Sequence, residues 1–284
     1  MYKPRFCKYN CSNVLLKGCH EGWCRGVWVT ISNAFTHSVS VFFPAYNDAP
    51  SIPKLIADIF EILPGIAEDF EVIVVNDGSR DNTGEVLAGL AREYGPRLRV
   101  ITHEQNRGYG GALRSGFAAA TKELVFYTDG DGQYDVRELP KLVERISPDV
   151  GLVNGYKLQR NDPQHRIWIG SAYNAFARFL FRVKIRDIDC DFRLIRRALL
   201  DDIHLISTSG TICVELVRKI ELTPWRVVEV GVGHYPRLHG RSQFFRVRSL
   251  MQTLYQLTRL YVIVGLSDSV DRGRRRLQWI TERR

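Results

Sequence analysis

Two aspartates, Asp129 and Asp131, directly follow a short apolar run and have the types and spacing to do chemistry. The run, residues 124–128, is β-branched and aromatic, which predicts a buried parallel strand ending at the sheet edge where open α/β folds bind ligands. If the extended conformation continues through Gly130, both carboxylates face one spot, and the glycine lets a ligand approach the backbone. Two like charges this close need a cation, and hard oxygen ligands suit Mg²⁺ or Mn²⁺ completed by water and phosphate oxygens.

An isolated Asp-Gly-Asp is also typical of a plain surface turn, so the surrounding elements matter. Polar residues follow two further predicted strands: Asn47 and Asp48 come after residues 39–43, and Asp77 comes after residues 72–75. Strands that alternate with helices imply a parallel sheet with right-handed crossovers, so these turns share one edge and favour a ligand site. The other elements predicted here are helices over about 51–63, 83–94, 112–121 and 137–146 and strands over 98–102 and 150–154.

A glycine-rich loop, residues 106–111, precedes the helix predicted to begin at Ala112. Its glycines permit close approach, and helix N-terminal amides favour phosphate, although a plain start to a helix is the simpler alternative. The loop follows the third strand and lacks the G-x-G-x-x-G register, so it is not a dinucleotide fingerprint, and no G-K-[ST] occurs that would form a P-loop. His103-Glu104 begins like a zinc-protease helix, but the second histidine is missing.

Composition indicates a globular chain with an anionic partner. Of its 284 residues 45% are hydrophobic and 25% charged, and the formal net charge is +9. The excess implies attraction to nucleic acid, to phosphate-bearing substrates or to an acidic membrane face. Much of it lies late in the chain, at Arg237, Arg241, Arg246, Arg248 and residues 272–276.

The chain ends differ from the centre. Residues 1–37 show no sustained period and are predicted to be a flexible extension. Its cysteines, Cys7, Cys11, Cys19 and Cys24, lack the paired short knuckles of a zinc site. Neither a signal peptide nor an apolar stretch of about 20 residues occurs, so a cytoplasmic setting is expected. We expect the main domain over 38–243 and an interfacial amphipathic helix with a basic tail over 244–284.

Basic and aromatic residues interleave in residues 157–186. This pattern suits single-stranded nucleic acid, with bases stacked on the aromatics. It equally suits a phosphate carried on a lipid, with the aromatics against the acyl region. A solvated amphipathic helix is the plain alternative.

Taken together, residues 39 to about 250 resemble the family 2 glycosyltransferases, which have a GT-A fold: a mostly parallel, Rossmann-like sheet flanked by helices. The resemblance rests on the P-A-Y-N turn ending at Asn47, the D-G-S-x-D-x-T turn starting at Asp77, the N-x-G of 106–108 and the D-x-D-G-Q-Y of 129–134. Later pieces, residues 187–197 and the R-x-x-G-R-S of 237–242, resemble the dolichyl-phosphate mannose and glucose synthases and their bacterial undecaprenyl-phosphate relatives.

The resemblance implies transfer of a sugar from a UDP- or GDP-sugar to a polyprenyl phosphate, with Mg²⁺ or Mn²⁺ and on the cytoplasmic face of an anionic membrane. It implies that Asp129, Asp131 and Gln133 hold the metal and donor diphosphate and are catalytic. The nucleotide sugar would be bound by Pro44, Tyr46, Asn47, Asp77, Arg107 and Gly108, with Asp77 on the base. The acceptor phosphate would be bound by Lys157, Arg166, Arg237 and Ser242.

The acceptor decides whether a base is needed. A phosphate monoester has a second pKa near 6, so at about pH 7 it is already deprotonated and can attack without a general base. A hydroxyl acceptor does need a general base. No carboxylate in 187–191 is therefore expected to titrate as a base. The alternatives are a glycosyltransferase with a hydroxyl acceptor, a nucleic-acid-binding protein and an inactive scaffold. A nucleic-acid-binding protein is not expected, because that function leaves the acidic turns unexplained.

Overall fold

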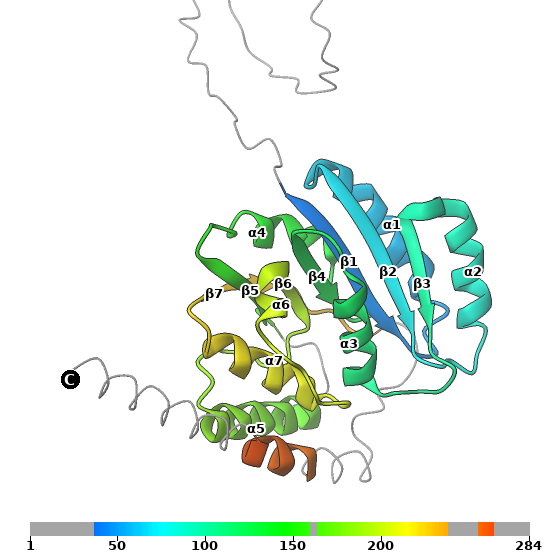
Figure 1. Ribbon diagram of the computed structural model, residues 1–284. Helices are drawn as coiled ribbons and strands as arrows, with labels where there is room; N and C mark the ends of the chain where they lie inside the picture. The colour runs from blue at the N-terminus through cyan, green and yellow to red at the C-terminus, as the bar shows by residue number, and fades with distance from the viewer. Residues whose placement is uncertain (1–36, 160–163, 238–254, 264–284) are drawn as a thin grey trace, which may run out of the picture. The chain divides into compact units, whose positions relative to one another are not determined.

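The computed structural model describes residues 37–159, 164–237 and 255–263, with only the backbone of residues 165 and 166. Seven strands form one sheet in the order β3-β2-β1-β4-β6-β5-β7 (Figure 1). The strands are β1 (Ser38–Ala45), β2 (Asp69–Asn76), β3 (Leu98–Thr102), β4 (Leu124–Thr128), β5 (Val150–Lys157), β6 (Phe192–Arg196) and β7 (Arg226–Val232).

Helices cover both faces of this sheet. They are α1 (Ile52–Ile62), α2 (Thr83–Tyr94), α3 (Tyr109–Ala119), α4 (Leu139–Val143), α5 (Gln164–Phe181), α6 (Arg197–Asp201) and α7 (Thr211–Glu221), with short 3-10 turns η1 (Leu63–Gly65), η2 (Gly95–Arg97) and η3 (Val136–Glu138). Residues 255–263 are also helical. None of the helices in the described ranges is long and apolar enough to cross a bilayer.

Alternation along the central strands divides the core into two layers. In β4, Phe126 packs with α1, α2 and α4, whereas its neighbours Val125 and Tyr127 pack with α3, α6 and α7. Side chains on a strand point alternately to its two faces, so a continuous apolar run is what a strand covered on both sides requires. The predicted α/β fold with a mostly parallel sheet is therefore confirmed, and the strands predicted over 98–102 and 124–128 have those bounds.

The departure from a parallel sheet is β6, which pairs antiparallel with both β4 and β5. Thr128 at the end of β4 lies opposite Phe192 at the start of β6. The loop that enters β6 therefore reaches the same edge as the carboxyl ends of the other strands. The elements β6, α7 and β7 were not among those predicted, although α7 does carry apolar residues at helical spacing.

Two glycines fit the elements around this edge together. A Cβ on Gly116 of α3 would lie 2.2 Å from Phe42 Cδ2, so the helix lies against the β1 ring only because this side chain is missing. A Cβ on Gly130 would lie 2.5 Å from the Pro44 carbonyl oxygen. The expectation that Gly130 admits a ligand is thus corrected, since the end of β1 already occupies that space.

Candidate active site at the carboxyl edge of the sheet

The two aspartates after β4 lie at the predicted edge, but the expectation that the chain stays extended through Gly130 is wrong. Residues 130 and 131 form a turn, and Asp131 Oδ1 accepts the Gln133 backbone N–H at 3.0 Å. Asp131 Oδ2 is paired with the Arg237 guanidinium, and Asp129 Oδ1 accepts the Tyr109 hydroxyl at 2.7 Å. The turn thus gives the two carboxylates separate partners from α3 and from the segment after β7.

Negative charge is concentrated here. Burial raises the pKa of Asp129 well above its ordinary value, and the charges of Asp191 and Asp131 raise it further. Burial likewise raises the pKa of Asp48, with Asp131 adding to the rise. A carboxylate whose pKa is raised in this way gains from a nearby cation, which is the kind of ligand that the D-x-D spacing had suggested.

A hard divalent cation fits this set of oxygen donors. Among the residues that the structure describes, no three His, Cys, Asp or Glu side chains come together in a way that could hold a metal ion alone. Mg²⁺ usually takes only one or two protein carboxylates and completes its octahedron with water and substrate phosphate oxygens. Asp129 and Asp131 therefore suit an ion that arrives with a diphosphate, and are too few for a permanent structural metal.

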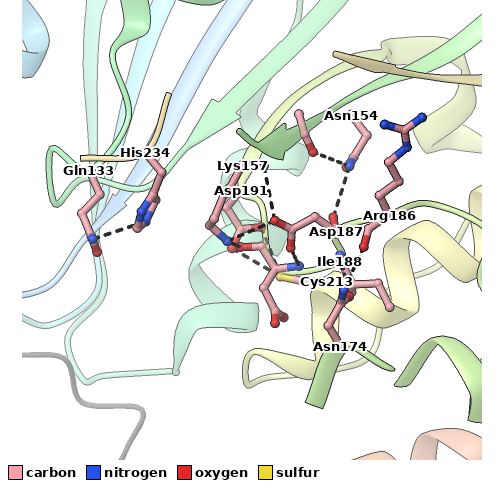
Figure 2. A network of polar contacts seen from close by, with 12 residues as sticks. Gln133, Asn154, Lys157, Asn174, Arg186, Asp187, Ile188, Asp191, Cys213 and His234 are labelled. Carbon is pink, nitrogen blue, oxygen red and sulfur yellow. Dashed lines mark hydrogen bonds and ion pairs between the residues drawn. The ribbon is translucent and has the colours of Figure 1, made fainter. Parts of the chain in front are cut away.

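Gln133 lies beside the segment that follows β7. Its side-chain amide nitrogen is 3.2 Å from the Tyr235 carbonyl oxygen and 3.3 Å from His234 Nε2, and its main-chain carbonyl accepts the Tyr235 backbone N–H at 2.8 Å. Figure 2 shows Gln133 and His234 as a pair that stands apart from the cluster around Lys157. The D-x-D-G-Q-Y turn is thus fastened to the chain that carries Arg237.

Asp77 is buried at the end of β2, with 3% of its surface exposed. Its Oδ1 accepts the Arg107 backbone N–H at 2.8 Å and contacts His103 Nδ1 at 2.6 Å. Its carbonyl accepts the Asn106 amide at 3.0 Å. The D-G-S turn and the N-x-G loop, 30 residues apart, are therefore joined through this residue.

The P-A-Y-N turn after β1 is tied to the same region. Asn47 adopts a left-handed conformation with φ 57°, and its Oδ1 accepts the Arg80 N–H at 2.8 Å. The Tyr46 N–H bonds to the Asp48 carboxylate at 3.0 Å, and the main chain of Pro44 closes against Gly130. The structure thus brings together the predicted residues from β1, β2 and β4, although the Asn47 side chain serves to join two loops.

Gly108 begins α3 with φ 79°, and a Cβ there would lie 2.4 Å from the Thr208 carbonyl oxygen. That carbonyl also accepts the Gly110 N–H at 3.0 Å. The glycines of this loop therefore allow contact with residues 207–208, a segment that the sequence did not link to the site.

A buried polar cluster lies at the entrance to β6. Arg193 is fully buried and bonds to Asn154 Oδ1 at 2.6 Å, to the Tyr127 hydroxyl and to the Ile188 carbonyl. It also forms an ion pair with Asp191 at 3.2 Å. The arginine neutralises an acidic neighbour of Asp129 and fixes the strand ends, a role that its place in a short mixed run did not reveal.

Lys157 at the end of β5 belongs to this cluster (Figure 2). Its ammonium donates to the Asp189 carbonyl at 2.6 Å and lies 3.6 Å from Asp187 Oδ2. Of the other residues predicted to bind the acceptor phosphate, Arg237 pairs with Asp131 in the D-x-D turn, whereas Ser242 and the side chain of Arg166 lie outside the described residues.

Comparison with known proteins finds a matching family and named relatives. The model of glycosyl transferase family 2 matches residues 40–204. An undecaprenyl-phosphate 4-deoxy-4-formamido-L-arabinose transferase of Pseudomonas fluorescens is 29% identical over 238 residues, covering 81% of this chain and 69% of the relative. Its Aeromonas hydrophila namesake is 28% identical, covering 83% of this chain and 73% of the relative.

A solved structure shares the fold. Glucosyl-3-phosphoglycerate synthase of Mycobacterium tuberculosis, in complex with Mn²⁺, UDP and phosphoglyceric acid, superposes with a TM-score of 0.59 at 20% identity and covers 82% of this chain and 78% of its own. The GT-A-like architecture expected from the sequence is thereby confirmed.

Proposed function

This chain belongs to glycosyl transferase family 2 and is a glycosyltransferase, and we propose that it moves a sugar from a nucleotide diphosphate to a polyprenyl phosphate. Relatives named as undecaprenyl-phosphate sugar transferases support this acceptor class. The observation that carries the proposal is the meeting of Asp129, Asp131 and Asp77 at one sheet edge beside Arg237.

On the donor side, we assign the base to Asp77 and the nucleoside to the P-A-Y-N turn. Pro44 and Tyr46 would form one wall of the nucleoside site and Arg107 and Gly108 the other, because Asp77 joins the two loops. Asn47 would shape the wall through its bond to the 79–81 turn.

At the diphosphate, Asp129, Asp131 and Gln133 would hold Mg²⁺ or Mn²⁺ with the phosphate oxygens. The solved neighbour that contains Mn²⁺ and UDP supports this kind of cofactor. When bound, the ion would stabilise the negative charge that gathers on the departing diphosphate.

The transfer itself exchanges one carbon–oxygen bond for another. A phosphate oxygen of the acceptor forms a bond to the anomeric carbon, while the bond from that carbon to the diphosphate oxygen breaks and its electron pair leaves with the diphosphate. The acceptor is already ionised near pH 7, so no protein base is required. Lys157, Arg166, Arg237 and Ser242 are proposed to face the acceptor phosphate.

A lipid acceptor implies a membrane surface, and α5 has a suitable face. Trp168, Ile169, Phe176 and Phe179 lie within about 100° of one another around the helix, and Phe179 is 84% exposed. Exposed basic residues, Arg182 and Lys184, follow the helix. We propose that α5 lies on anionic lipid at the cytoplasmic face, with its aromatics in the interface.

Radiolabelled sugar transfer tests the function. UDP- and GDP-sugars are incubated with polyprenyl phosphate, with Mn²⁺ or with EDTA, and the organic phase is counted. We expect counts only with metal and none with Asp131→Ala. Label that stays aqueous while donor is consumed would identify a hydroxyl acceptor or water instead. A folded protein that consumes no donor would contradict the proposal.

The membrane contact is tested separately by flotation with anionic liposomes. We expect Trp168→Ala/Phe179→Ala to lower the bound fraction, with Tyr94→Ala on α2 as the control. The same bound fraction for the wild type, the double variant and the control would show that α5 does not contact the membrane.

A further inference from the structure

His103 follows β3 directly and is enclosed by polar partners, with its side chain only 3% exposed. Its backbone N–H donates to the Asn76 carbonyl at 2.9 Å. Its ring nitrogens lie 2.6 Å from Asp77 Oδ1 and 2.9 Å from Ser115 Oγ. The histidine of the H-E pair that resembled an incomplete zinc motif is thus the centre of an Asp77–His103–Ser115 chain, in which Asp77 and His103 are buried and Ser115 is half-buried.

The contact with Asp77 fixes the proton on His103 Nδ1. A carboxylate only accepts, so His103 Nδ1 must carry a hydrogen and donate it to Asp77. In the neutral ring Nε2 is then an acceptor, and the Ser115 hydroxyl is the group that donates to it. Ser115 therefore holds the ring in the orientation and tautomer that serve Asp77.

The Asp77 carboxylate is hydrogen-bonded through one of its two oxygens. Oδ1 receives both the His103 ring N–H and the Arg107 backbone N–H, at 2.6 and 2.8 Å. No hydrogen bond to Oδ2 occurs within the described ranges. Two donors on one oxygen stop the carboxylate from rotating and keep it as an acceptor, so the second oxygen offers one fixed point of recognition.

We propose that His103 and Ser115 are positioning residues that make the base subsite select a nucleobase with a ring N–H. This deepens the proposed function and rests on it. A fixed carboxylate oxygen accepts uracil N3–H or guanine N1–H. Cytosine N3 and adenine N1 are themselves acceptors, so in the same position they leave two lone-pair groups facing each other.

A role limited to folding predicts something different. If the Asp77–His103–Ser115 hydrogen bonds serve only the fold, replacing His103 weakens the binding of every nucleotide by the same factor or lowers only the stability of the protein. A positioning role changes the ratio between bases, because all nucleoside diphosphates share the diphosphate and ribose contacts. The ratio is therefore the quantity to measure.

The experiment is calorimetric titration of the full chain with Mn²⁺ and two size-matched pairs, UDP with CDP and GDP with ADP. We expect the wild type to prefer the N–H partner of at least one pair by about tenfold or more, the factor that one hydrogen bond to a charged group supplies. His103→Leu lowers that preference to within about threefold. His103→Gln, whose amide can still donate, retains most of it.

Two further variants complete the test. Ser115→Ala, a substitution that favours helix, reduces the preference in the same direction but less, which gives a result even if His103→Leu does not fold. His204→Leu removes an exposed histidine without contact to Asp77 and leaves the preference unchanged.

An equal loss for all four nucleotides, or an unchanged preference in both His103→Leu and Ser115→Ala, would overturn the assignment. A wild type that binds no nucleotide overturns it together with the donor side of the proposed function. A wild type that discriminates between bases but glycosylates no polyprenyl phosphate contradicts only the proposed acceptor.

Discussion

Replacing Tyr109 by phenylalanine removes one oxygen atom from the candidate metal site. The hydroxyl donates to Asp129 Oδ1 at 2.7 Å from the first turn of α3. Burial, and next the charge of Asp129, raise the pKa of Tyr109 well above its ordinary value of 10, so the hydroxyl remains a donor at any working pH. Tyr109→Phe leaves the ring in place and takes away only this hydrogen bond.

The magnitude follows from that bond. A hydrogen bond to a charged group contributes about 1.5–3 kcal/mol net, which corresponds to roughly a 10–150-fold change in an equilibrium or rate constant. Because the same hydrogen bond opposes the rise in the pKa of Asp129, its loss makes the carboxylate a poorer partner for a cation. We expect kcat/KM for sugar transfer to fall by about this factor and the Mn²⁺ concentration for half-activation to rise.

The assay is initial-rate sugar transfer at varied Mn²⁺, with thermal unfolding as the check on folding. Tyr94→Phe is the matched control, since Tyr94 lies at the far end of α2 and packs on Phe60, with ring centroids 4.3 Å apart. Tyr109→Phe activity within threefold of the wild type at every Mn²⁺ concentration would refute the positioning of Asp129 by Tyr109. So would an equal loss in Tyr94→Phe.

Three further predictions concern stability. Gly116→Ala places a methyl group 2.2 Å from Phe42 Cδ2, and this overpacking should lower the free energy of unfolding by about 1–3 kcal/mol. Gly89→Ala in α2, where a Cβ would have nothing within 4 Å, should be neutral or stabilising. Thermal melts that do not separate the two variants would contradict the packing at α3. Burial would raise the pKa of Glu71, but hydrogen bonds from neighbouring groups outweigh it and lower that pKa below its ordinary 4.5. Its stabilisation is therefore complete above pH 4.5 and lost as the pH falls through the lower folded value, and urea titrations should show a flatter acid limb for Glu71→Gln. Arg193→Met strands a buried carboxylate and should cost about 3–5 kcal/mol in urea unfolding, with partial recovery in the double variant Arg193→Met/Asp191→Asn; no recovery would show that the charge pair is not the cause.

The first half of the fold was predictable because its local patterns agree with its tertiary environment. All five residues of β4 are buried because both faces of the sheet are covered, its first four side chains are aliphatic or aromatic, and the strand ends at an acidic turn. In such a strand the run itself marks the bounds, and the following polar residues mark the edge. The same reasoning located Asp77 and Asn47, because parallel strands all deliver their carboxyl ends to one side.

The second half was less predictable because its elements depend on distant partners. β6 contains two arginines in five residues, a pattern with no strand period. Arg193 is tolerated in the core because Asn154 and Tyr127, from two other strands, bond to it and Asp191 balances its charge. His103 is similar: its two partners lie 26 residues before it and 12 after it, so no local pattern separates it from an ordinary histidine.

The reversal of β6 explains how the edge proposed to bind the donor also receives a loop proposed to face the acceptor. In a wholly parallel sheet the loop between β5 and a following strand would carry its polar residues to the opposite edge. Because β6 runs antiparallel to β4, the acidic loop that precedes it returns to the D-x-D turn, and the charge of Asp191 adds to the rise in the pKa of Asp129. Arg193 pairs with Asp191 in that loop, and this fixed cation offsets the charge that an acidic loop brings to the acidic D-x-D turn.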